Sequence, residues 1–294
     1  MSSIAAPLPR PALVSRRRLR LSAAWLGAGI VAGFAATAVL APLVAPYHPT
    51  AYVAAPLLRP TGAYLLGTND VGQDILSELI YGARVSLTVA LLGAGLSLAL
   101  ALLVGVSAAT VGGWFDALLM RVVDVFMAVP HLPLMIVLAA FLGPGLNSVI
   151  LVVVLVMWAG PARVIRAQVL TLRERAHVKS ARLLGGSHFY LMRRHLLPAV
   201  TPVAAAAFVS LAGRAVMMEA GLAFLGLGDP TLKSWGGVLR AALNFDGIYL
   251  TPYWLWWALP AGACISLLVV GFTLWGTALE RYGNARVDRL QTRA

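Results

Sequence analysis

The chain has 294 residues, of which 60% are hydrophobic and only 12% are charged, and its formal net charge is +12. Soluble globular domains carry about 25% charged residues, so the composition excludes an ordinary soluble protein and indicates an integral membrane protein. The basic residues are divided among separate segments instead of forming one patch, so the positive charge does not indicate a nucleic-acid-binding protein.

Six apolar stretches are long enough to cross the hydrocarbon core of a bilayer, which takes about 20 helical residues. In chain order, we predict membrane-spanning helices at Leu21–Ala45, Val85–Ala109, Ala117–Leu142, Ser148–Val169, Ala199–Leu225 and Trp254–Leu279. The apolar runs are continuous, which favours helices over the alternating strands of a barrel. The sequence therefore predicts an all-α integral membrane protein.

Basic residues concentrate on one side of these spans. If the N-terminus is cytoplasmic, 18 of the 23 lysines and arginines lie in cytoplasmic segments, and only Arg59, Arg84, Lys233 and Arg240 lie outside. Because cytoplasmic loops are enriched in Lys and Arg, we predict a multi-pass protein of the cytoplasmic membrane with both termini inside. The first span follows an arginine cluster like that of a signal sequence, but its apolar region of about 25 residues favours a retained anchor.

The two predicted external segments differ in composition. The first begins after Pro46, contains several further prolines, and ends in Asp74–Arg84, whose apolar residues share one side and predict a short amphipathic helix. The second, residues 226–253, is aromatic together with the start of the next span. We interpret these rings as a belt at the boundary of membrane and water, with stacking on a sugar or peptide as the alternative. They are Trp235, Tyr249, Tyr253, Trp254, Trp256 and Trp257.

The basic loop Thr171–Pro198 lies between the fourth and fifth predicted spans. Leu172–Leu184 is expected to form one short helix, which Gly185 and Gly186 end, and Ser187 is expected to cap a second. From spacing alone, two interpretations are equally favoured. The loop is either a docking surface for a soluble partner or an amphipathic hairpin that lies on anionic lipid.

The same loop carries a motif with fixed spacing. Lys179-Ser180-Ala181 is followed by three residues, Gly185, nine residues and His195-Leu196-Leu197-Pro198. This pattern resembles the cytoplasmic "EAA" loop of binding-protein-dependent ABC transporter permeases, in which Glu-Ala-Ala, Gly and Ile-x-Leu-Pro occupy these places. Lys179 reverses the charge of the family glutamate, and His195 replaces the isoleucine.

Four further stretches resemble the C-type permease of the dipeptide, oligopeptide and nickel group. They are Leu66–Asp74, Leu79–Leu87, Glu219–Gly228 and Ser234–Gly236, and the similarity extends over roughly residues 21–282. The resemblance implies a type I ABC importer permease with six transmembrane helices. Its MetI-like core would be residues 85–280, preceded by an extra N-terminal helix and external segment at 21–84. Residues 1–20 and 281–294 would be cytoplasmic tails.

The resemblance also implies a division of labour among subunits. The loop at 171–198 would dock on an ATPase as a coupling element, and the residues expected to form it are Lys179, Ser180, Ala181, Arg182, Gly185, His195, Leu197 and Pro198. The implied partners are two ATPase subunits or domains, a distinct B-type permease, an external substrate-binding protein and membrane lipid. ATP and Mg²⁺ would be bound by the ATPases, with no cofactor in this chain. The implied solute is a di- or oligopeptide, with nickel or another small solute as the alternative.

The sequence contains neither an ATP-binding motif nor a zinc-binding motif. A phosphate-binding loop requires Gly-x-x-x-x-Gly-Lys-Ser/Thr, which is missing from the chain. His177, His188 and His195 lack the i, i+4 spacing of a helical zinc site, so surface histidines are the favoured interpretation and no metal site is predicted. We therefore predict a transporter subunit without an ATPase site of its own.

Two charged residues lie within the fifth predicted span, Arg214 and Glu219. A charge at the bilayer centre costs about 2.5–3.5 kcal/mol, so both should face protein or water. They are candidates for lining a translocation path, with contact to a neighbouring subunit as the alternative. Arg121 and Asp124 are expected to form a local ion pair. The rival function, an ion-coupled secondary transporter, would need a relay of buried carboxylates, and Glu219 is the only clear one.

Overall fold

The computed structural model of the chain describes the backbone of residues 13–291 and the side chains of residues 23–279 except those at positions 177 and 188. Over these residues the regular structure is helical, and the only β pairing is two isolated bridges, Tyr52 with Gln73 and Thr68 with Asp74. The predicted all-α fold is confirmed.

The helices are α1 (Leu13–Val39), α2 (Ala41–Val44), α3 (Ile75–Val111), α4 (Gly113–Ala128), α5 (His131–Leu142), α6 (Leu146–Met157), α7 (Ala159–Arg173), α8 (Ala176–Leu183), α9 (His188–Leu191), the π-helical turn η1 (Met192–Leu196), α10 (Leu197–Phe224), α11 (Trp235–Asn244), the 3-10 turn η2 (Pro252–Leu255) and α12 (Ala258–Gln291).

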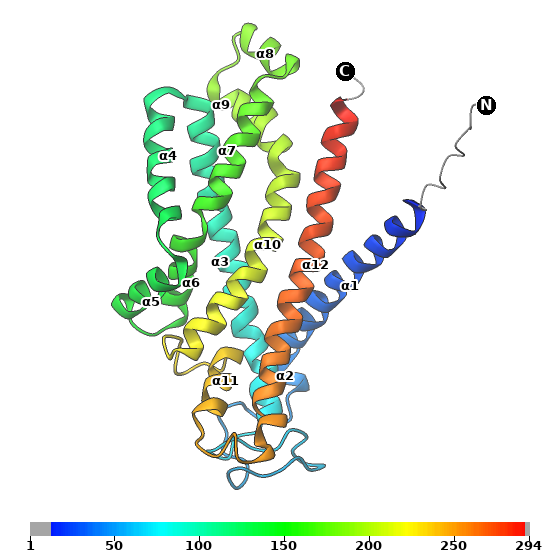
Figure 1. Cartoon of the computed structure of the whole chain (residues 1–294), viewed down its shortest axis with the longest axis vertical. Helices are drawn as coiled ribbons and strands as arrows, with labels where there is room; N and C mark the ends of the chain where they lie inside the picture. The colour runs from blue at the N-terminus through cyan, green and yellow to red at the C-terminus, as the bar shows by residue number, and fades with distance from the viewer. Residues whose placement is uncertain (1–12, 292–294) are drawn as a thin grey trace, which may run out of the picture.

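Helices α3, α7, α10 and α12 pack side by side, and α1 lies against α12 (Figure 1). Glycines allow the close approach: a Cβ atom at Gly105 of α3 would lie 2.5 Å from the carbonyl oxygen of Ala162 on α7. A Cβ atom at Gly213 of α10 would lie 3.0 Å from the Cβ of Phe272 on α12. Small residues at contacts are typical of membrane helices, which gain little from a hydrophobic effect and depend on close packing.

Several of the described helices could cross a membrane. Ile75–Val111, Phe189–Phe224 and Pro252–Leu279 are long and apolar enough, and the number among the described residues rises to five if each of two bent helix pairs is one span. Helix α1 adds a shorter apolar stretch, Ala23–Val39. These helices indicate a multi-pass membrane protein, whereas the count of six transmembrane helices stays a prediction.

The second predicted span begins earlier than expected. Asp74 caps α3, because its carboxylate accepts a hydrogen bond from the backbone N–H of Ser77 at 2.9 Å, and the helix then continues without a break to Val111. The helix expected over Asp74–Arg84 is present, but it is not a short helix of its own, since residues 75–84 form the first turns of α3. The charge of Glu78 is tolerated in this buried position because a lysine far along the chain compensates it.

The third predicted span, Ala117–Leu142, is not one straight helix. Helices α4 and α5 meet at an angle of 93°, because Val129 precedes Pro130 and takes an extended conformation, with φ −83° and ψ 129°. A residue before proline is disfavoured in the helical region. The fourth predicted span bends as well, by 44° between α6 and α7.

The two ends of the molecule differ in character. Helix α8 lies at one extreme of the long axis, and the last turns of α12 and the start of α1 point toward the same end (Figure 1). Helices α2 and α11 and the irregular segments at 45–74 and 245–257 form the opposite end, here called the external cap after the predicted topology. Residues 1–12 and 292–294 of the expected tails lie outside the described residues. Which end faces the cytoplasm stays a prediction.

Aromatic residues of the external cap are only partly at the surface. Trp235 is completely buried, its indole N–H donates a hydrogen bond to the carbonyl oxygen of Leu79 at 2.8 Å, and its ring meets Phe34 edge-on at 5.1 Å. Trp257 is also buried, whereas Tyr249 is exposed. The expected interfacial belt was therefore wrong for Trp235 and Trp257, which hold the cap together.

Candidate functional site

The loop between α7 and α10 folds as two short helices joined at glycine. Helix α8 ends where Gly185 takes a φ of +88°, and the backbone N–H of Gly186 bonds to the carbonyl oxygen of Ala181 at 3.0 Å. The hydroxyl of Ser187 then accepts a hydrogen bond from the N–H of Tyr190 at 3.2 Å, which caps α9. These features confirm the expected glycine stop and serine cap. The expected single helix over Leu172–Leu184 was wrong, because α7 ends at Arg173 and α8 begins at Ala176.

Apolar side chains anchor this loop on the helix bundle. Val178 of α8, Leu191 of α9 and Leu196 of η1 are all buried, and they pack in one cluster with residues of α3 and α7. Arg173 adds a hydrogen bond from its guanidinium to the carbonyl oxygen of Ala109, near the end of α3. The loop is therefore a firmly supported part of the fold.

The tip of the loop is apolar and points away from the protein. Leu183 and Leu184 are 87% and 88% exposed, and Phe189 is 64% exposed. Next to them, Lys179 and Glu174 form an exposed ion pair with a separation of 2.8 Å. The hydrogen bond and charge of Lys179 lower the pKa of Glu174 from its ordinary value. Large exposed apolar side chains in a cluster are typical of a surface that another molecule covers.

The residues expected to form the coupling element include exposed and half-buried positions of this loop. Lys179, Ser180, Arg182, Gly185 and Pro198 are exposed. The others are half-buried, namely Ala181, His195 and Leu197, and the ring of His195 meets that of Tyr190 edge-on at 5.7 Å. Pro198 follows the π-helical turn η1 inside a continuous helical run from Phe189 to Phe224, so its missing N–H leaves a carbonyl of the preceding turn without a helical partner. Contact of these residues with a partner stays a prediction.

The structure separates the two charged residues of the fifth predicted span. Arg214 is exposed and lines a partly open cavity of about 750 Å³ between α4, α5, α6, α7 and α10, here called the internal cavity because it lies between helices. Glu219 is only 3% exposed, and its carboxylate accepts a hydrogen bond from the hydroxyl of Ser86 on α3 at 2.9 Å. Arg214 therefore lines a cavity, and Glu219 lies in the contact between α3 and α10, where it also forms a hydrogen bond with Ser234 just before α11. A role for either in translocation stays a prediction.

Two ion pairs between α4 and α7 were not foreseen from the sequence. Asp124 pairs with Arg163, so the expected local pair of Asp124 with Arg121 was wrong. Asp116 accepts two hydrogen bonds from Arg166, each of 2.5 Å. The i, i+3 spacing within α4 favoured Arg121 as the partner of Asp124, but the carboxylate of Asp124 pairs instead with Arg163 of α7.

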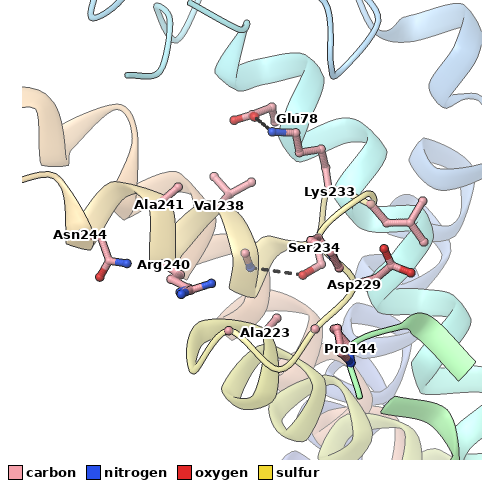
Figure 2. A pocket seen from close by; sticks show the side chains of 15 residues that line it. Glu78, Pro144, Ala223, Asp229, Lys233, Ser234, Val238, Arg240, Ala241 and Asn244 are labelled. Atoms are coloured by element: carbon pink, nitrogen blue, oxygen red, sulfur yellow. Dashed lines mark hydrogen bonds and ion pairs between the residues drawn. The ribbon is translucent and has the colours of Figure 1, made fainter. Parts of the chain in front are cut away.

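The external cap contains a second cavity, of about 440 Å³, between the end of α10, the loop 226–234 and α11 (Figure 2). A polar network closes one side of it. The ammonium of Lys233 lies 2.6 Å from the carboxylate of Glu78 and 2.7 Å from the side-chain oxygen of Gln73, and the amide of Asn69 donates to Glu78 at 3.0 Å. The only sequence signal for this network was the polar run at 68–74 just before the helix.

The loop beside this cavity is fixed by Asp229. Its carboxylate accepts hydrogen bonds from the N–H and hydroxyl of Thr231, at 2.8 and 2.6 Å, and from the N–H of Leu146 at the start of α6, at 3.2 Å. The hydrogen bond from the Thr231 hydroxyl is the largest contribution that lowers the pKa of Asp229. Among the described residues, no three potential metal ligands gather, and the side chains of His177 and His188 lie outside the description.

Comparisons with known proteins agree on one family. Residues 101–282 match the family model described as "Binding-protein-dependent transport system inner membrane component". A protein of Brucella suis biovar 1 named as a peptide permease is 36% identical over 234 residues, which cover 79% of this chain and 77% of the relative. A second one from the same organism, named as a peptide transport system permease, is 35% identical over 273 residues, covering 91% and 89%. An Escherichia coli K12 protein named as a D,D-dipeptide transport system permease is 32% identical, covering 82% and 80%.

One solved structure shares the fold. It is a chain of the MetNI methionine ABC transporter in inward-facing conformations, with a TM-score of 0.58 and 17% sequence identity, and the match covers 72% of this chain and 97% of that one. At this identity the likeness concerns the fold alone. It confirms the expected MetI-like helical core.

Proposed function

Because the chain belongs to the family of binding-protein-dependent transport system inner membrane components, we propose that it is the permease subunit of an ABC importer for peptides. The observation that carries the proposal is the similarity to relatives named as peptide or dipeptide permeases over most of both chains. These names favour a peptide over nickel as the solute.

The exposed loop tip supports docking on an ATPase over contact with lipid. Leu183, Leu184 and Phe189 project from a support that is packed against α3 and α7, and α8 lies at the extreme of the long axis (Figure 1). A rigid apolar tip beyond the ends of the membrane helices suits a groove in a soluble subunit. In this proposal ATP and Mg²⁺ bind to two ATPase subunits, and this chain has no catalytic activity.

The remaining partners follow from the same proposal. A distinct second permease completes the translocation path, and an external substrate-binding protein delivers the peptide to the external cap. Both termini and the loop 171–198 then face the cytoplasm, with tails at 1–20 and 281–294, an N-terminal region at 21–84 and the permease core at 85–280. The exposed apolar residues of α4 and α5, such as Leu118, Val125 and Phe141, are available for lipid or the second permease.

Reconstitution in vesicles tests the proposal. The chain is combined with its partner permease, ATPases and binding protein, and accumulation of a labelled tripeptide is measured with ATP supplied on the loop side. We expect uptake that requires ATP and the binding protein, and no ATP hydrolysis by the purified chain alone. Uptake driven by a proton gradient without ATP would instead identify an ion-coupled secondary transporter.

A further inference from the structure

Two basic side chains line the cavity of the external cap, and they differ in whether an acidic side chain neutralises their charge. Lys233 is compensated, since Glu78 lies 2.6 Å from its ammonium group. Arg240 of α11 also lines the cavity and is exposed, and it forms no ion pair with any residue whose side chain the structure describes. The guanidinium therefore presents an uncompensated positive charge to the space inside the cavity.

The position of this guanidinium depends on a glycine. Gly226 has a φ of +82°, and a Cβ atom there would lie 2.6 Å from Cζ of Arg240 and 2.7 Å from its Nη1. The arginine thus lies across the bare backbone just after α10. Asn244 lines the same cavity and is four residues further along α11, which places its amide on the same side of that helix.

The other polar groups of the cavity do not compete for this charge. The carboxylate of Asp229 already accepts three hydrogen bonds from Thr231 and Leu146, and Figure 2 shows it beside Pro144, away from Arg240 and Asn244. A planar guanidinium with an amide next to it matches a carboxylate, which accepts two parallel hydrogen bonds. A volume of about 440 Å³ is in the range of small-molecule sites, about 300–1,000 Å³.

We propose that this cavity is an entry subsite that binds the carboxylate of the transported solute, with Arg240 as the residue that contacts it and Asn244 beside it. The inference rests on the proposed function. It restricts the solute to molecules with a free carboxylate, such as unmodified peptides, and excludes metal cations. The volume, which is in the range of small-molecule sites, supports a solute over a protein side chain as the source of the carboxylate. Helix α10 borders this cavity at Ala223 and the internal cavity at Arg214 and Met218, on different sides of the helix.

Protection of a cysteine reporter tests the subsite without transport. In an otherwise cysteine-free assembled complex with Cys264→Ala, Ala241→Cys places a thiol in the cavity beside Arg240. The rate of its reaction with N-ethylmaleimide is measured without binding protein, in the presence of dialanine or of dialaninamide, which lacks the carboxylate. We expect dialanine to slow the reaction several-fold and the amide to have no effect. Loss of a charge-assisted pair should raise the dialanine concentration for half-protection by about tenfold or more in Arg240→Met, and by less in Arg240→Lys.

Arg59→Met is the matched control, because Arg59 is an exposed external arginine outside the cavity, and it should leave protection unchanged. Equal protection by acid and amide, protection that survives Arg240→Met, or no protection at any soluble concentration would overturn the proposal. One further outcome would overturn it: dialanine protects neither the parent complex nor the Arg240→Met complex, and Arg240→Met weakens the affinity for the binding protein. Arg240 would then contact a carboxylate of the binding protein instead of one on the solute. The assay reads the cavity directly, so failure of ATP-driven uptake would count against the transporter assignment alone.

Discussion

The ammonium group of Lys233 lies 2.6 Å from the carboxylate of Glu78 and so joins the loop before α11 to the first turn of α3. The side chain of Glu78 is 3% exposed and that of Lys233 is 28% exposed. Asn69 and Gln73 complete the network from the segment before α3. Two segments of the external cap that are far apart in the sequence are therefore held together by hydrogen-bonded charges.

Removal of one partner of this pair should destabilise the external cap strongly. Lys233→Met leaves the Glu78 carboxylate buried without compensation, at a cost of about 3–5 kcal/mol. Adding Glu78→Gln removes the stranded charge, and much of the stability should return. Thermal unfolding of the purified protein in detergent measures both effects, with Arg59→Met as an exposed reference. A double variant as unstable as Lys233→Met alone would show that the charge pair is not the cause.

Gly185 should matter for coupling more than for folding. Its φ of +88° disfavours a β-branched residue, and no atom lies within 4 Å of a Cβ placed there, so Gly185→Val adds backbone strain of about 1–2 kcal/mol without a clash inside the chain. Gly113 offers a matched control, with a φ of +61° and equally open space outside the loop. We expect Gly185→Val to lose peptide uptake and ATPase retention at normal membrane levels, and Gly113→Val to keep both.

Normal uptake and normal ATPase retention in Gly185→Val would refute the coupling assignment of the loop. The lipid alternative makes the opposite forecast, because neutralising Arg193 and Arg194 would then impair function more than the change at Gly185. Both sets of variants are compared at matched abundance in the membrane.

Lys179→Glu should weaken the contact with the ATPase and leave the fold intact. The ion pair with Glu174 is exposed on both sides, at 56% and 74%, and such pairs contribute little to stability. Although Lys179→Glu restores the glutamate of the family motif, in this chain it places two carboxylates together on a docking surface whose partner accommodates a lysine, so less ATPase should co-purify at low salt. The deficit should shrink in about 1 M salt, where charges are screened within about 3 Å. Full ATPase retention at low salt would mean that Lys179 lies outside the contact.

Glu219 provides a test of structural contact against a role in the path. Both Ser86 and Ser234 hydrogen-bond the Glu219 carboxylate, and Glu219→Gln retains one oxygen acceptor while its amide can donate to the other hydroxyl, so we expect little change in melting temperature and unchanged uptake. Glu219→Ala removes that acceptor from a buried contact, at about 1–3 kcal/mol, and should lower the melting temperature while uptake per folded complex persists. Loss of uptake by Glu219→Gln with a normal melting temperature would assign this side chain to the path.

Orientation can be measured with single cysteines. Ser180 and Thr231 are both exposed; Ser180 is in α8 at one end of the molecule, and Thr231 is in the loop before α11 in the opposite half. In a Cys264→Ala background, a membrane-impermeant thiol reagent added outside intact cells should label Thr231→Cys and spare Ser180→Cys. Labelling of both from outside would contradict the proposed topology.

Local chemistry in the sequence predicted those features that depend on neighbouring residues. The glycine stop at Gly185, the cap at Ser187 and the long apolar helices near Ala199–Leu225 and Trp254–Leu279 are all present. The sequence failed where distant segments decide the outcome. The apolar side of Asp74–Arg84 made the start of α3 look like a short helix of its own, and nothing local indicates that Lys233 compensates the charge of Glu78 within it.

The same reason explains the missed pair of Asp124 with Arg163, which depends on how α4 meets α7. The break at Pro130 did have a local signal, but hydropathy summed over Ala117–Leu142 hides a single residue. The cavity with Arg240 arises from three segments that only the folded chain brings together.

The 93° corner between α4 and α5 constrains what can surround this subunit. Carbonyl groups at the end of α4 and N–H groups at the start of α5 lack partners within their helices, and hydrocarbon cannot supply any. Met127 and His131, on either side of the corner, line the internal cavity, where water can reach the open backbone groups. We therefore expect this corner to face the aqueous interior of the finished transporter, while the exposed apolar sides of α4 and α5 away from the corner stay available to lipid.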